Sequence, residues 1–343
     1  MRKQLFIALI VVLFVGVGAF SAYSVMPKNK QSPDVAKLDK LTLALDWTPN
    51  TNHTGLYVAQ AEGWYEEEGI ELEILPYSTA STPDALVGNN KADIGVSFTE
   101  SIVTSSATDS PVTSIAAILP TNTSSIAVRE DSGIKSLKDL DGKLFGGYGT
   151  AYEKPVMKTA ITNDGGKGDF ETVVVQTGLL ESLESEEVDF VWIYDGWDKI
   201  KAEQDGFKIK TFPLKDQSIP DYYTPNLISS DATINKKKEA LKRFMIATQK
   251  GYEFAAENPE DAAKKLISQV DKEFLPNEKL VIESQKYLAN IYSDSDKPWG
   301  FQDKKMWQDY PNFMLKNKAI VNAEGKPITS IDNQSLYTNK LLP

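Results

Sequence analysis

A turn near the start of the folded region holds the residues that could do chemistry most directly. Residues 41–55 read LTLALDWTPNTNHTG and contain the only histidine of the chain, His53. An imidazole can act as a general base, but catalysis also needs a nucleophile or an orienting acid, which this sequence does not single out. Asp46, Trp47 and Asn50 instead predict a wall of a binding site, while a capping or core role remains the alternative for each.

A second cluster of aromatic and acidic residues lies at residues 191–198, VWIYDGWD. Trp192, Tyr194 and Trp197 are too dense for one core face, because alternate strand residues point to opposite sides. Aromatic faces bind flat rings, with stacking worth about 1–3 kcal/mol per ring by analogy with nucleobases. Asp198 could accept a hydrogen bond of about 1.5–3 kcal/mol from a ring nitrogen or amine. A wholly structural core is the alternative.

Two further segments offer polar groups at the start of a helix. Glu100, in ADIGVSFTES, is predicted to face a cleft and accept from an amino group, although the helix dipole alone favours a carboxylate there. The turn GGYGTAYEKPVMK contains Tyr148 and Tyr152. Such a turn can bind an anion through free N–H groups, but neither a P-loop nor a complete GxGxxG motif is present. A tight turn is therefore the alternative to a contact with a polar ligand end.

Alternating strand and helix patterns must position these residues. A strand at 41–45, a helix at 55–63 and a strand at 70–74 predict a parallel βαβ unit. The segments LVGNNKADIGVSFTES and LESEEVDFVWIYDGW share a plan: a helix end, an Asp, an apolar strand, then polar and aromatic residues. Because ligands gather at the carboxyl ends of strands in α/β sheets, this repeat predicts two strand ends facing one cleft.

We therefore expect an α/β protein with two lobes joined by a two-segment hinge. The predicted first lobe comprises residues 41–122 and 226–343, and the second comprises residues 123–225. Residues 210–225 are Pro- and Tyr-rich and suit a returning crossover, and the amphipathic helices after residue 236 are expected to complete the first lobe.

Composition excludes several classes of function. The 343 residues carry a formal net charge of −11, so most of the surface would repel nucleic acid. The chain has no cysteine and one histidine, which excludes disulfides, thiolate metal sites and a histidine-rich zinc site. We expect no metal, no cofactor and no nucleic-acid partner, and a ligand that is neutral or cationic.

The N-terminus predicts export from the cytoplasm. Residues 1–26 contain two basic residues, Arg2 and Lys3, and an uncharged run of 22 residues from Leu5 to Met26, which is typical of a signal peptide or an uncleaved membrane anchor. Residues 27–40 are expected to be a linker. Both alternatives place the folded part outside the cytoplasm. A sensor lobe would need a fused output domain, which we do not expect here.

Four segments together resemble one protein family: LALDWTPNTNHTGLYVAQAEGWYEEEGIELEI, ADIGVSFTES, GGYGTAYEKPVMK and VWIYDGWD. They are similar to extracytoplasmic substrate-binding proteins of the thiamine-pyrimidine precursor type, and the similarity continues to PWGFQDKKMWQDY. The resemblance implies a two-lobed type II periplasmic-binding-protein fold, each lobe a mixed sheet flanked by helices. It implies an aminopyrimidine ligand such as formylaminopyrimidine, delivered to an ABC permease and its ATPase. Trp47, Asn50 and Glu100 would contact the ligand from the first lobe, and six residues would do so from the second: Tyr148, Tyr152, Trp192, Tyr194, Trp197 and Asp198.

The same superfamily contains fungal hydroxymethylpyrimidine phosphate synthases, which consume one of their own histidines and carry a cysteine-rich iron segment. The place of the donor histidine matches Ser101 here, and the region of the cysteines reads YYTPNL. The resemblance therefore implies a binding protein and no enzyme. Riboflavin or another aromatic nutrient is the alternative ligand.

Overall fold

The computed structural model describes residues 38–343 except 176, 276, 293–295 and 323–324. The predicted signal peptide or anchor at residues 1–26 lies outside the described residues, as does the linker up to residue 37. Within the described part of the chain, no helix is both long and apolar enough to cross a membrane.

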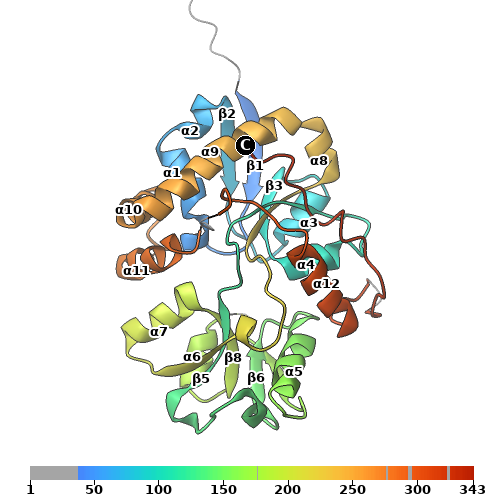
Figure 1. The fold of residues 1–343 in the computed structure, drawn as a ribbon. Coiled ribbons are helices and arrows are strands. Elements are labelled where there is room, and N and C mark those ends of the chain that lie inside the picture. The colour runs from blue at the N-terminus through green and yellow to red at the C-terminus, as the bar shows by residue number, and fades with distance from the viewer. Residues whose placement is uncertain (1–37, 176, 276, 293–295, 323–324) are drawn as a thin grey trace, which may run out of the picture. The chain divides into compact units, whose positions relative to one another are not determined.

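Sheet A contains five strands in the order β2-β1-β3-β10-β4 (Figure 1). β1 runs parallel to β2 and β3, whereas β10 is antiparallel to β3 and β4. The predicted parallel βαβ unit is confirmed, with Leu41 of β1 opposite Leu72 of β2. The strands are β1 Asp39–Ala44, β2 Ile70–Leu75, β3 Ile94–Ser97, β4 Thr113–Ala117 and β10 Asn226–Ser229.

Helices cover both faces of sheet A, and its central strand β3 is buried throughout. Leu41 and Leu43 pack on one face, and Ala44 packs on the other. The first face carries α1 Thr54–Ala61, α2 Trp64–Glu67, α9 Lys238–Glu257, α10 Pro259–Gln269 and α11 Glu278–Ala289. The second carries α3 Pro83–Gly88, α4 Thr99–Ser105 and α12 Met306–Lys316. A short α8, Asp231–Lys236, precedes α9.

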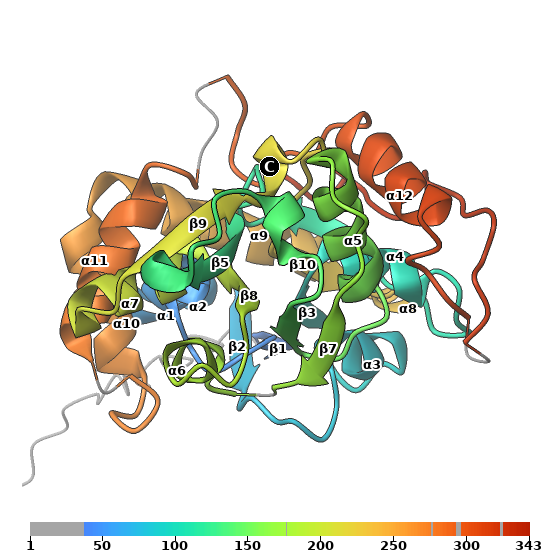
Figure 2. The ribbon, with the colours of Figure 1, turned by 90° about the horizontal axis from the view of Figure 1, so that it is seen from below.

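Sheet B also has five strands, in the order β7-β6-β8-β5-β9, with β5 antiparallel to β8 and β9. Figure 2 shows α5 on one side of these strands and α6 and α7 on the other. The strands are β5 Ser124–Arg129, β6 Leu144–Gly147, β7 Glu171–Val174, β8 Phe190–Tyr194 and β9 Ile209–Pro213. The helices are α5 Glu153–Asn163, α6 Leu179–Glu184 and α7 Ile200–Asp205. Short helical turns are η1 Thr51–His53, η2 Glu130–Ser132, η3 Leu137–Leu140, η4 Asp195–Lys199 and η5 Leu214–Asp216.

One prediction in this region was wrong at its start. Residues 210–225 were expected to cross between the lobes, and the chain does cross after residue 213, but Ile209–Pro213 is β9, the outermost strand next to β5. All five residues of β9, IKTFP, are half-buried. They show neither an apolar run nor strict alternation, so the sequence pattern did not predict a strand. The expected mixed sheets flanked by helices are nevertheless confirmed for both lobes.

The predicted internal repeat has a structural basis in two aspartates. The Asp93 carboxylate accepts from the N–H of Thr42 on β1 at 3.0 Å. The Asp189 carboxylate accepts from the N–H of Leu144 on β6 at 2.8 Å. In both lobes the Asp lies directly before one strand, β3 or β8, and its hydrogen bond joins that strand to the neighbouring parallel strand, β1 or β6. The repeat therefore fixes the register of β1 with β3 and of β6 with β8.

Two segments join the sheets, one after β4 and one before β10 (Figure 1). Asp221 in the second segment accepts from the Asn122 N–H at 2.8 Å and from the Thr121 hydroxyl at 2.5 Å in the first. The two crossings are thus hydrogen-bonded to each other. We propose the lobe boundaries at 122/123 and 225/226, because both fall within these segments.

Candidate functional site

The predicted site residues lie just past the carboxyl ends of four strands. Asp46 and Trp47 follow β1, and Glu100 follows β3; β1 and β3 are parallel neighbours in sheet A. Tyr148 follows β6, and the VWIYDGWD segment contains the end of β8; β6 and β8 are parallel neighbours in sheet B. The sequence repeat therefore places the two halves of the candidate site at equivalent positions, as expected for a ligand site in α/β sheets.

His53 orients Asp46 and has no free nitrogen for other chemistry. Its ring is fully buried, and its Nδ1 accepts from the Asn50 N–H at 3.2 Å. The proton of the neutral ring therefore lies on Nε2, which is 2.7 Å from Asp46 Oδ1. The Asn50 side chain caps the turn by accepting from the Asn52 N–H at 2.9 Å. Asn50 thus shapes the turn, whereas the second oxygen of Asp46 has no hydrogen-bond partner in this network.

Three aromatic rings meet at the boundary between the lobes, and we call Trp47, Tyr77 and Tyr148 the aromatic lip. The Trp47 ring lies 5.1 Å from that of Tyr77 on its own lobe and 6.4 Å from that of Tyr148 on the other. Trp47 is 38% exposed and Tyr148 is 42% exposed. Large aromatic side chains at such exposure lack a core role, so they are available to a ligand. Tyr77 was not predicted, although it follows β2 directly.

Glu100 is buried among tyrosine hydroxyls. Its Oε1 accepts from the Tyr310 hydroxyl at 3.0 Å, and the Tyr222 ring stacks on Tyr310 at 3.7 Å. Burial raises the pKa of Glu100, and hydrogen bonds from Tyr222 and Tyr310 oppose that shift. The charge of Glu100 also raises the pKa of Tyr152 and Tyr194 on the other lobe, in both cases after the larger effect of burial. This carboxyl is therefore near four tyrosine side chains from four segments of the chain.

Tyr222 and Tyr310 were also missed, although the sequence carried a signal for both. Tyr222 lies in the Pro- and Tyr-rich segment before β10, and Tyr310 lies in the PWGFQDKKMWQDY segment. Both segments were singled out without a chemical role. Only the packing of α12 against the second crossing brings these rings to Glu100.

The aromatic residues of β8 do not all face the boundary. Trp192 and Tyr194 are two residues apart and share one strand face with the core residue Phe190. Trp192 is only 7% exposed and packs edge-on against Tyr152 at 6.4 Å. Trp192 is thus buried among core residues, and the ligand contact predicted for it stays a prediction. Its indole N–H has no hydrogen-bond partner among the described residues.

The two remaining residues of the cluster hold the η4 turn. Asp198 accepts from the Tyr194 N–H at 2.9 Å, and burial raises the pKa of Asp198 to about 6. Trp197 packs against the apolar core of sheet A, on the other lobe. A cavity of about 20 Å³ lies beside it and is also lined by Asn50, Tyr194 and Leu288. Such a volume holds about one water molecule, so the lobes are closely apposed at this point.

The glycine-rich turn already has an anion in place. The Glu153 carboxylate accepts from three successive N–H groups, those of Tyr148, Gly149 and Thr150, at 2.8, 2.8 and 2.9 Å. The sequence left open a contact between this turn and a polar ligand end. These N–H groups are engaged by Glu153, which was not singled out.

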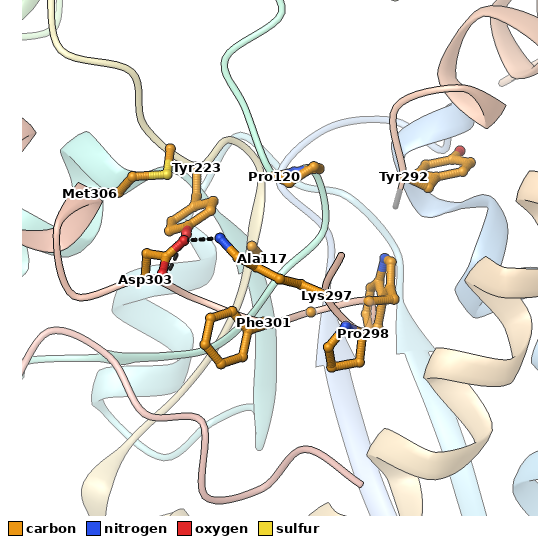
Figure 3. Close-up of a pocket in the computed structure, with 11 residues that line it drawn as sticks. Ala117, Pro120, Tyr223, Tyr292, Lys297, Pro298, Phe301, Asp303 and Met306 are labelled. Atoms are coloured by element: carbon orange, nitrogen blue, oxygen red, sulfur yellow. Dashed lines mark hydrogen bonds and ion pairs between the residues drawn. The ribbon is translucent and has the colours of Figure 1, made fainter. Parts of the chain in front are cut away.

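A larger cavity, of about 80 Å³, lies beside the crossings (Figure 3). Tyr223 and Asp303 line it, and the Asp303 N–H donates to the Tyr223 hydroxyl at 2.7 Å. Lys297 forms an ion pair with Asp303 at its edge. None of the predicted site residues lines this cavity, so we assign it to the packing of the hinge.

Acidic groups dominate the electrostatics of the first lobe's side of the site. Burial, with a smaller contribution from the charge of Asp46, raises the pKa of Asp84 to about 6. The Ser97 hydroxyl donates to Asp84 at 2.7 Å, which opposes the shift. With Glu100, three carboxyl groups thus lie near the strand ends of sheet A. Such groups accept hydrogen bonds from amines and repel oxoanions.

Asp84→Asn is expected to stabilise the ligand-free protein at neutral pH. A carboxyl whose pKa is higher in the folded state binds its proton more tightly there, so its ionisation lowers the free energy of unfolding as pH rises from about 4 to about 6. Removing the charge should raise that free energy at pH 7.5 by up to about 3 kcal/mol. Urea unfolding at pH 4.5 and 7.5 measures the effect. The exposed Asp109→Asn is the control, and an equal gain for Asp84→Asn at both pH values would contradict the assignment.

The arrangement can bind a flat ring that carries an amine. The aromatic lip offers ring faces, Asp46 and Glu100 offer acceptors, and the Tyr152 and Tyr194 hydroxyls can donate to ring nitrogens. No cluster of three or more metal-ligating side chains occurs within the described residues.

Comparison with known proteins adds four relationships. Residues 50–262 match the family model described as NMT1/THI5 like. The formylaminopyrimidine-binding protein of Halalkalibacterium halodurans is 29% identical over 82% of this chain and 86% of its own length. The 4-amino-5-hydroxymethyl-2-methylpyrimidine phosphate synthase of Legionella pneumophila is 25% identical over 89% of this chain and 92% of its own. A solved structure of a putative periplasmic sulfonate-binding protein of an ABC transporter from Methylobacillus flagellatus covers 90% of this chain and 93% of that chain, with a TM-score of 0.64 and 17% identity. This last likeness concerns the fold alone.

Proposed function

Because the chain belongs to the NMT1/THI5-like family, we propose that it is the solute-binding component of an ABC importer. Its proposed ligand is a thiamine-pyrimidine precursor, formylaminopyrimidine or a related aminopyrimidine. The protein would bind this ligand outside the cytoplasm and deliver it to a permease and its ATPase. The expected fold, a two-lobed periplasmic-binding-protein fold, is the scaffold for this role.

The observation that carries the proposal is the buried Glu100 carboxyl, which lies near tyrosine side chains of both lobes. A carboxylate can accept about four hydrogen bonds, so Glu100, which accepts from Tyr222 and Tyr310, keeps capacity for the amine of a ligand. Trp47 and Tyr148 would cover the ring faces, and Asp46 would be a second acceptor. We propose Tyr152, Tyr194 and Trp197 as further contacts, with Asn50, Trp192 and Asp198 supporting the shape of the site.

Binding without chemistry is the second part of the proposal. Both nitrogens of the single histidine are engaged within its own turn, and the chain has no cysteine. Ligand entry would require the lobes to separate, because Trp47 and Tyr148 are in contact across the boundary. Closure would then restore this contact over the ligand.

Calorimetric titration of the purified protein with 4-amino-5-hydroxymethyl-2-methylpyrimidine and formylaminopyrimidine tests the ligand class. Saturable binding of either, with none for taurine, supports the proposal. Binding of taurine without either pyrimidine would refute it, and binding of riboflavin alone would transfer the role to another aromatic nutrient. Native mass spectrometry of protein purified without added ligand provides an independent check.

A further inference from the structure

Ser284 is a buried serine of the first lobe whose hydrogen bond crosses the lobe boundary. It lies on α11, and its hydroxyl donates to the carbonyl oxygen of Gly196 in η4, on the second lobe. The hydroxyl oxygens of Ser284 and Thr51 are 2.6 Å apart. Since the single hydroxyl proton of Ser284 goes to Gly196, Thr51 is the donor in this second bond. All three residues are buried, so water does not compete for these groups.

Apolar packing surrounds these two hydrogen bonds. Ser284, Tyr287 and Leu288 are spaced three and four residues apart, so they share one face of α11. A β-carbon built on Gly196 would lie 3.0 Å from Leu288 Cδ2 and 3.1 Å from Tyr287 Cδ1. The next residue, Trp197, packs on the apolar core of sheet A. η4 therefore fits closely onto α11, and glycine at position 196 permits this approach.

The two hydrogen bonds of Ser284 respond differently to a separation of the lobes. Thr51 and Ser284 both belong to the first lobe, so their bond would remain. The bond to Gly196 joins the lobes and would break. Only a contact that differs between two states can shift the equilibrium between them. This bond has that property, and it connects η1, on the first lobe's side of the candidate site, with the residue directly before Trp197 on the second.

We propose that Ser284 is a latch for lobe closure, which holds η4 against α11 in the closed form and releases Gly196 in the open form. The latch consists of groups of the chain itself, so it favours closure whatever ligand the site binds. A ligand that binds the closed form has an apparent affinity proportional to the fraction of protein in that form. The inference goes beyond the proposed function, because it concerns the equilibrium between the lobes and not the identity of the ligand.

Ser284→Ala is expected to shift the ratio of closed to open protein about tenfold toward the open form, which corresponds to about 1.4 kcal/mol. The substitution leaves the carbonyl of Gly196 without its donor in the closed form. Since the chain has no native cysteine, two introduced cysteines can carry fluorophores without competing labelling sites. Asp109→Cys and Glu187→Cys are at exposed positions, one on each lobe. Single-molecule energy transfer between the fluorophores measures the ratio in the ligand-free protein.

Two variants control for a purely structural role of Ser284. Thr51→Val removes a buried hydroxyl whose bond lies within the first lobe, and Ser268→Ala removes a hydroxyl bonded within α10. We expect Thr51→Val to lower the free energy of unfolding, measured with urea, but to shift the lobe ratio less than Ser284→Ala does. Ser268→Ala should leave the ratio unchanged. A Ser284→Ala variant that loses stability at an unchanged lobe ratio would overturn the proposal, as would an unmodified protein without a closed population.

Gly196→Ala keeps the proposal testable if Ser284→Ala does not fold. This variant adds a methyl group against Leu288 and removes no hydrogen-bonding group. It should therefore also shift the lobe ratio toward the open form. An unchanged ratio would contradict the proposal.

A binding measurement separates this inference from the proposed function. The affinity of Ser284→Ala for 4-amino-5-hydroxymethyl-2-methylpyrimidine should fall by up to about tenfold, in proportion to its closed fraction. If this pyrimidine does not bind the unmodified protein, the proposed ligand is wrong, while the lobe ratio measured without ligand still decides the role of Ser284.

Discussion

Glu100→Gln is expected to lower the affinity for the aminopyrimidine roughly 10- to 100-fold. A hydrogen bond to a charged group contributes about 1.5–3 kcal/mol, and the amide cannot replace the charge. The same change should stabilise the ligand-free protein at neutral pH, because burial raises the pKa of Glu100 and so disfavours the ionised form. Opposite changes in affinity and in stability are therefore the signature of a buried carboxyl kept for its ligand. Calorimetric titration and urea unfolding at pH 7.5 measure the two quantities.

Tyr310→Phe is the matched control for this variant. It removes the hydroxyl that donates to Glu100 at 3.0 Å but leaves the carboxyl and the stacked ring in place. We expect a smaller loss of affinity, of roughly tenfold or less, as for one hydrogen bond. The affinity of the unmodified protein should also rise with pH as Glu100 ionises, and Glu100→Gln should lose that dependence. An unchanged affinity in Glu100→Gln would remove this residue from the ligand site.

Gly251→Ala is expected to destabilise the protein by at least about 2 kcal/mol, because overpacking forces two backbones apart. A methyl group on Gly251 in α9 would lie 2.0 Å from the carbonyl oxygen of Gly55 in α1. Helix propensity alone predicts the opposite sign, a gain of about 1 kcal/mol for Gly→Ala. We expect the steric clash to outweigh the gain in helix propensity, because the carbonyl oxygen of Gly55 belongs to the backbone and cannot rotate away from the new methyl group. Urea unfolding provides the measurement.

Ile246→Ala, also on α9, provides the comparison. Its side chain is 41% exposed, so we expect a change within about 0.5 kcal/mol of the unmodified protein. The Gly251→Ala variant should also bind the ligand more weakly than the unmodified protein. The reason is that α1 begins directly after the His53 turn, so separation of α1 from α9 would displace that turn. A stabilised Gly251→Ala variant would show that the helices move apart without cost.

The contacts of Glu100 connect the proposed ligand site to the hinge. Tyr222, which hydrogen-bonds to Glu100, is the neighbour of Asp221, and Asp221 holds the two crossings together. Tyr223 is in turn anchored by the N–H of Asp303. A ligand that engages Glu100 would therefore act directly on the segment about which the lobes move.

Sequence patterns predicted the strands with strong apolar alternation and missed the others. β1, β2 and β3 follow from alternation or an apolar run, and the parallel pairing of β1 with β2 follows from the helix between them. β7 was not predicted, because all four of its residues are exposed and it forms an edge of sheet B. β9 was predicted to be part of a crossing between the lobes, because its half-buried residues show neither an apolar run nor strict alternation. Edge strands bury little surface, so their sequences carry little periodic signal.

The sequence by itself determined which strand ends carry the site. The repeat around Asp93 and Asp189 sets equivalent central strands in both lobes, and local chain geometry places Asp46 and Glu100 just past strand ends and Tyr194 at the last position of β8. Only the tertiary structure decided how each side chain is used there. It buried Trp192, engaged Asn50 in its turn, filled the glycine-rich turn with Glu153, and brought Tyr77, Asp84, Tyr222 and Tyr310 to the site. The physical reason is range: periodicity and turn chemistry act between near neighbours in the chain, whereas burial and hydrogen-bond partners depend on residues that are distant in the chain, such as Glu100 and Tyr310, which are 210 positions apart.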